Sequence, residues 1–116
     1  MPSKEKKQTN LELFFDNCVG LAKFDPTTAR NMVEQLTDLF RQHNREFNKK
    51  GRAIISHVQE KITIEEALLT AKQEYRTGSF TEARTYLEMA EHYAGECNYD
   101  VSNRINHIKE VFENYA

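Results

Sequence analysis

Apolar residues recur every three or four positions along most of the chain, which is the spacing of amphipathic α-helices. The stretch 64–94 shows it most clearly, with two such stripes on either side of a turn at Thr77-Gly78-Ser79. The first stripe is Ile64, Ala67, Leu68, Ala71 and Tyr75, and the second is Phe80, Ala83, Tyr86, Leu87, Ala90 and Tyr93. Small residues in both stripes allow two antiparallel helices to approach closely. The pattern predicts a helical hairpin in which Gly78 has a positive φ.

The same spacing predicts further helices before and after this hairpin. One helix follows Thr9, and the longest amphipathic pattern starts at Pro26. That pattern continues through the basic segment 48–51, so residues 26–62 form either two helices or one helix kinked at Gly51. Ala53 to Ile62 is helical in both interpretations. A last helix is expected from Val101 to Tyr115.

Polar residues with capping chemistry mark the expected helix starts. The spacing of a capping box occurs three times, at Thr9 with Glu12, Thr63 with Glu66 and Ser79 with Glu82. Asp25 is expected to cap the helix that begins at Pro26, and Asp100 the last helix. The residues from Gly95 to Tyr99 break the pattern between the last two helices.

These elements predict an all-α fold of five or six short-to-medium helices in a compact bundle. The chain has 116 residues with only four Gly and two Pro, and so few chain breakers favour helices over a β fold. The length suits one domain, which we expect at 9–116 behind a disordered tail at 1–8.

Charge is distributed unevenly although the net charge is only −2. Residues 41–61 hold six basic and two acidic residues, whereas 62–116 hold five basic and ten acidic ones. The basic segment is a candidate polyanion-binding site, with Arg41, Arg45, Lys49, Lys50 and Arg52 as its contacts. The alternatives for this segment are a solvated helix end and contact with an acidic protein partner. The asymmetry also predicts weak homo-oligomers held by charge, and the alternative is a monomer.

The hairpin resembles a tetratricopeptide-repeat unit over residues 64–94. Gly78, Phe80, Ala83 and Ala90 match the turn glycine, the aromatic and the small positions of that family. Thr70 departs from the family pattern, and no Pro closes the unit. Because a single unit cannot bury both its faces, the flanking helices must cover it. A microtubule-interacting-and-transport module and an unrelated helical bundle are the alternatives.

No residue constellation indicates catalysis, so we expect neither an enzyme nor a cofactor. Glu88, His92 and Glu96 share one helix face, but the same spacing suits solvated charges, and no metal is expected. Cys18 and Cys97 are too few for a disulfide framework and fit a reducing compartment. The absence of a long apolar run predicts a cytoplasmic protein without a membrane segment.

The resemblance implies a small adaptor, chaperone or regulator that recognises a helix or peptide of a partner protein. The candidate contacts lie on the hairpin and are Lys72, Tyr75, Arg76, Arg84, Tyr86 and Glu88. The alternative function is a nucleic-acid-associated regulator that uses the basic segment 41–61. The C-terminal half is rich in tyrosine, which either contacts a partner or packs in the core. These residues are Tyr75, Tyr86, Tyr93, Tyr99 and Tyr115.

Overall fold

Five α-helices make up most of the computed structural model, which describes residues 10–43 and 49–114. They are α1 (Asn10–Ala22), α2 (Pro26–His43), α3 (Lys49–Arg76), α4 (Phe80–Glu96) and α5 (Ser102–Asn114). No strand occurs within those ranges, and the predicted all-α class is confirmed. The tail expected at 1–8 and the capping box at Thr9 fall outside the described residues.

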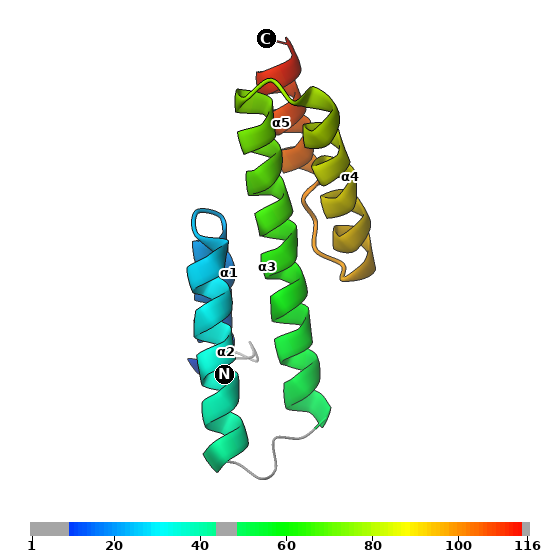
Figure 1. Cartoon of the computed structure of the whole chain (residues 1–116). Helices are drawn as coiled ribbons and strands as arrows, with labels where there is room; N and C mark the ends of the chain where they lie inside the picture. The colour runs from blue at the N-terminus through cyan, green and yellow to red at the C-terminus, as the bar shows by residue number, and fades with distance from the viewer. Residues whose placement is uncertain (1–9, 44–48, 115–116) are drawn as a thin grey trace, which may run out of the picture.

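The central element is α3, which contacts each of the other four helices (Figure 1). Its 28 residues extend for roughly 42 Å at the usual rise of an α-helix. Its N-terminal half packs against α1 and α2, whereas its C-terminal half packs against α4 and α5. Within the described helices, the backbones of α1 and α2 do not approach those of α4 and α5.

Two hydrophobic cores therefore form on the same helix. The N-terminal core consists of Phe15, Cys18, Val19, Ala22, Ala29, Val33, Ile55, Val58 and Ile62. The C-terminal core consists of Ile64, Ala67, Leu68, Ala71, Tyr75, Ala83, Leu87, Ala90, Ala94, Val101, Ile105 and Ile108. Tyr99, in the α4–α5 connection, packs against both cores and so links them.

The apolar face of α3 changes sides between Ile62 and Ile64. Each residue advances an α-helix by about 100°, so the apolar set up to Ile62 and the set from Ile64 onward face nearly opposite directions. The capping box predicted at Thr63 is wrong, because the helix continues through this point. The Thr63 hydroxyl instead donates to the Gln59 carbonyl oxygen at 3.0 Å, a bond made inside a helix.

The other predicted helix boundaries agree with the structure in most details. Asp25 Oδ1 accepts the Thr28 backbone N–H at 3.1 Å, which caps α2, and Asp100 Oδ1 accepts that of Ser102 before α5. Gly78 has φ +85°, as predicted for the α3–α4 turn. Ser79 precedes α4, but its side chain makes no capping hydrogen bond, so only the position of that capping box is right.

Residues 26–62 form parts of two helices, which answers the question left open by the sequence. α2 ends at His43 and α3 begins at Lys49, so Gly51 lies inside α3 rather than at a break. Gly95 likewise lies inside α4, and the chain leaves that helix at Cys97 and Asn98, where Asn98 has φ 56°. The α3–α4 pair is the predicted helical hairpin, with α5 packed against both helices.

Candidate functional site

Three of the predicted protein-binding residues hold α5 against the hairpin. The Tyr75 side chain is buried, and its ring stacks on Phe112 of α5 with centroids 5.3 Å apart. Its hydroxyl donates to Glu113 Oε2 at 2.9 Å, and Arg84 Nε donates to Glu113 Oε1 at 2.7 Å. The Arg76 guanidinium lies 5.9 Å from the Phe112 ring centroid. Tyr75, Arg76 and Arg84 therefore contribute to internal packing on this side of the molecule.

Electrostatics agree with this internal role. Burial raises the pKa of Tyr75 to about 12, and the neighbouring Glu113 carboxylate acts in the same direction. Arg84 donates a hydrogen bond to Glu113 and lowers the pKa of that carboxyl. The other three predicted contacts are more accessible: Glu88 is exposed, and Lys72 and Tyr86 are half-buried.

A polar stripe runs along α3 between its two apolar faces. Its members recur at spacings of three and four residues and so share one side of the helix. They are Arg52, Ser56, Gln59, Thr63, Glu66 and Thr70. The stripe faces the space between α2 and α4, because residues from both of those helices line hollows above it.

Two adjoining hollows form a groove over this stripe. One has a volume of about 190 Å³ and is lined by Thr37, Arg41, Arg52, Ile55, Ser56 and Gln59. The other has a volume of about 370 Å³ and is lined by Ser56, Gln59, Glu60, Thr63, Tyr93 and Glu96. Ser56 and Gln59 belong to both. We name this continuous feature the α3 groove: its floor is α3, and its flanks are α2 and α4.

Arg30 of α2 connects this helix to the α3 floor of the groove. Arg30 Nη1 lies 3.0 Å from Glu66 Oε2, and Arg30 Nη2 donates to Thr63 Oγ1 at 3.1 Å. Thr37, by contrast, is buried and donates to the Val33 carbonyl oxygen of its own helix at 2.7 Å. The position of α2 beside α3 is thus set by side chains at the groove itself.

The two ends of the α3 groove differ in chemistry. Arg41 and Arg52, both exposed, line the end formed by α2 and α3. Glu60, Glu96 and the aromatic ring of Tyr93 line the end formed by α3 and α4. The Tyr93 side chain is 41% exposed and so is accessible to a ligand. A ligand along the floor would meet a basic end and an acidic, aromatic end.

The structure brings together two of the five predicted polyanion contacts. Arg41 and Arg52 come together at the basic end of the groove. Lys49 and Lys50 lie in the first turn of α3, and Arg45 falls outside the described residues. Sequence reasoning missed the groove residues Ser56, Gln59 and Tyr93. The signal that locates the floor is the polar spacing 52, 56, 59, 63 beside the apolar positions 55, 58 and 62.

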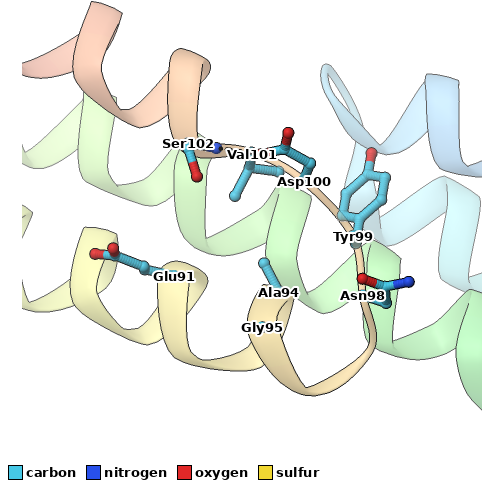
Figure 2. Close-up of a pocket in the computed structure, with 8 residues that line it drawn as sticks. All are labelled: Glu91, Ala94, Gly95, Asn98, Tyr99, Asp100, Val101 and Ser102. Atoms are coloured by element: carbon cyan, nitrogen blue, oxygen red, sulfur yellow. Dashed lines mark hydrogen bonds between the residues drawn. The ribbon is translucent and has the colours of Figure 1, made fainter.

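A further hollow of about 410 Å³ lies where α4 leads into α5 (Figure 2). Its lining comes from the end of α4, the connection and the first residue of α5: Glu91, Ala94, Gly95, Asn98, Tyr99, Asp100, Val101 and Ser102. Asp100 is engaged in the turn before α5, and Tyr99 points its hydroxyl toward Glu65. Asp100 and Tyr99 thus stabilise the α4–α5 connection, and the α3 groove is the better candidate for a binding site.

Behind the groove, a buried carboxylate connects α3 to α5. Glu65 is 1% exposed; Arg104 Nη1 donates to its Oε2 at 2.7 Å, and Arg104 Nη2 and the Tyr99 hydroxyl also donate to it. Burial raises the pKa of Glu65, but the hydrogen bonds from Arg104 and Tyr99 outweigh it and hold the pKa below its ordinary value. This network fixes the backbone of α3 under the groove.

No group of three or more His, Cys, Asp or Glu side chains in the described part of the chain is arranged to hold a metal ion. His92 Nε2 and Glu96 Oε1, two members of the helix-face set considered above, form an exposed pair at 3.1 Å. None of the described helices is both long and apolar enough to cross a membrane.

The fold and groove define an all-α protein in which α1 and α2 pack on one half of α3, and α4 and α5 pack on the other half. Comparison with protein-family models, with curated proteins and with solved structures found no significant match.

Proposed function

We propose that this protein is a small cytoplasmic adaptor, chaperone or regulator that binds a segment of a partner protein in the α3 groove. The observation that carries the proposal is the groove itself, a polar floor between two helical flanks with an exposed aromatic ring on one of them. Polar floors fix the register of a bound backbone, and aromatic side chains supply contact area at low entropic cost. Binding rather than catalysis suits this arrangement.

The hairpin resemblance supports the same function. A tetratricopeptide-like unit formed by the C-terminal half of α3 and by α4 would present its groove side to a peptide and be covered by α5 on the other side. Of the residues expected to bind, Tyr86 shares a side of α4 with Tyr93, although it lines a separate hollow with Thr81, Glu82, Thr85 and Met89 rather than the α3 groove. Tyr86 is seven residues before Tyr93 on α4, so both rings lie on one side of that helix.

A peptide library displayed on phage tests this function directly. We expect selection against the wild-type protein to enrich peptides that fail to bind Ser56→Trp, because an indole at this exposed floor position fills the groove. Asn106→Trp is the matched control, since Asn106 is also exposed but lies on α5. Enriched peptides that bind Ser56→Trp and wild type equally, or no enrichment at all, would contradict the proposal.

Nucleic-acid regulation is the second candidate, favoured by the meeting of Arg41 and Arg52 at one hollow. Salt dependence separates the two functions. Phosphate-backbone binding weakens steeply with added salt, because condensed counterions are released on binding, whereas aromatic-anchored peptide binding changes little. Anisotropy of a labelled oligonucleotide and of a phage-selected peptide, each at two salt concentrations, therefore distinguishes them: tight oligonucleotide binding that falls steeply with salt supports nucleic-acid regulation, and peptide binding that changes little supports the groove function.

A further inference from the structure

Arg41 and Arg52 differ from the other arginines in the described residues. Arg30 is paired with Glu66, Arg84 with Glu113 and Arg104 with Glu65, while Arg76 lies over the Phe112 ring. No ion pair of Arg41 or Arg52 occurs within residues 10–43 and 49–114. Arg41 and Arg52 therefore have neither a carboxylate nor an aromatic partner among the described residues, and they line the same hollow although they come from different helices.

The rest of this hollow also suits an anion. Its lining contains the hydroxyl of Ser56 and the amide of Gln59, and no acidic residue; Thr37 also lines it, but its hydroxyl already donates to the Val33 carbonyl oxygen. A planar guanidinium donates two parallel hydrogen bonds to a phosphate or carboxylate, and hydroxyl and amide groups add donors without adding charge. A phosphomonoester carries about −1.5 to −2 charge at neutral pH, which matches two arginines better than a single carboxylate does.

We propose that Arg41 and Arg52 form a subsite of the α3 groove that binds a phosphorylated side chain of the partner segment. The proposal rests on the proposed function, since it takes the ligand to be a peptide in that groove. A peptide suits the site better than a nucleic acid does. A phosphate backbone continuing along the floor would meet the carboxylates of Glu60 and Glu96, whereas a peptide brings its charge to one end only.

The length of the floor sets the spacing within the ligand. Thr63 is eleven positions after Arg52, which corresponds to about 16 Å along the helix axis. An extended peptide covers that distance in about five residues. The bound segment is therefore expected to place an apolar or aromatic side chain, for contact with Tyr93, within about five residues of the phosphorylated one.

Synthetic peptides test this subsite. The probe is a nine-residue Gly-Ser peptide with a phosphoserine and, five positions away, a phenylalanine; matched peptides carry serine or aspartate in place of phosphoserine. Fluorescence anisotropy measures their affinity, and a phosphate titration followed by amide chemical shifts measures the bare anion. We expect the phosphopeptide to bind at least about tenfold more tightly than the serine peptide, as hydrogen bonds to charged groups allow.

The variants identify the residues responsible. Arg41→Gln with Arg52→Gln should abolish the preference for phosphoserine, whereas Lys23→Gln with Lys109→Gln removes the same charge at exposed sites outside the groove and should keep it. Unchanged helicity by circular dichroism shows that both pairs fold.

Three outcomes would overturn the subsite. In the first, the serine or the aspartate peptide binds as tightly as the phosphoserine peptide. In the second, both double variants lose the preference for phosphoserine to the same extent. In the third, the protein responds to neither the phosphopeptide nor inorganic phosphate. A tighter complex with a twelve-residue oligothymidylate would assign the arginines to nucleic acid instead. If phage-selected peptides lose binding in Ser56→Trp but not in Arg41→Gln with Arg52→Gln, the groove function stands and only the subsite fails.

Discussion

Single residues show how polar groups are arranged around α3. Glu65 and Glu66 are neighbours in sequence but face different helices, Glu65 toward Arg104 of α5 and Glu66 toward Arg30 of α2. Glu65 is buried, whereas the Glu66 side chain is 41% exposed. Ion pairs at the surface contribute little to stability, and a buried carboxylate depends on its partners because water cannot replace them.

Glu65→Gln should accordingly destabilise the protein by about 1–3 kcal/mol, because it weakens three hydrogen bonds to a buried group and leaves Arg104 without its counter-charge. Glu66→Gln is the matched control and should cost less than about 1 kcal/mol. Urea denaturation measures both. Equal losses in the two variants would show that the Glu65 network contributes no more than a surface pair.

The pH dependence of stability tests the same carboxylate. Its pKa lies below the ordinary value of 4.5 in the folded protein, so the contribution of Glu65 is fully present above pH 4.5 and is lost as pH falls through the folded pKa. The free energy of unfolding of wild type minus that of Glu65→Gln should therefore shrink as the pH is lowered from 7 to 3. A difference that stays constant over this range would contradict the lowered pKa.

At the scale of elements, most helices could be predicted and one boundary could not. Asp25 with Pro26, and Gly78, mark the starts of α2 and α4 because their effects are local. Thr63 has the same local signature, yet its helix continues, because Ile62 and Ile64 are buried in two cores on opposite sides of α3. Whether the helix continues through Thr63 depends on packing against α1, α2, α4 and α5, and a short stretch of sequence around Thr63 does not contain those helices.

The candidate site was less predictable than the helices. The sequence predicts that Tyr75 contacts a partner, but α5 returns along the hairpin and buries it against Phe112. Arg41 was identified from charge alone. Its meeting with Arg52 in one hollow depends on how α2 packs against α3, and this packing is set by contacts far apart in the sequence, such as Arg30 with Glu66.

Two glycines provide a test of the hairpin turn. Gly78→Ala should destabilise the protein by about 1 kcal/mol, because φ +85° is unfavourable for a residue with a Cβ. An added Cβ would meet no heavy atom within 4 Å there, so strain rather than a clash is the cause. Gly95→Ala, inside α4 and equally free of neighbours, should stabilise by roughly 0.5–1 kcal/mol. Thermal melts that move in the same direction would contradict this account.

For the whole molecule, the central feature is that two cores share one helix and leave a polar groove between their covering helices. The apolar faces of α3 point apart, so α2 and α4 flank the floor without meeting. Side-chain networks on both sides, Arg30 with Glu66 and Arg104 with Glu65, hold this geometry. A preformed groove reduces the entropic cost of binding a flexible segment.

The uneven charge of the whole chain also predicts weak self-association. The basic segment 41–61 of one molecule would attract the acidic C-terminal half of another, and salt would screen this attraction over about 8–10 Å. Sedimentation should show a dimer at low salt that dissociates as salt is added. Replacing Lys49, Lys50 and Arg52 by Glu should abolish it with helicity retained. A monomer at both salt concentrations would end this hypothesis.

The most direct test of the groove is to map a phage-selected peptide on the protein by amide chemical shifts. We expect the largest changes at Thr37 and Arg41 of α2, along the floor from Arg52 to Thr63, and at Tyr93 and Glu96 of α4. Changes confined to α5 and the turn at Phe24, with the floor unaffected, would contradict this prediction.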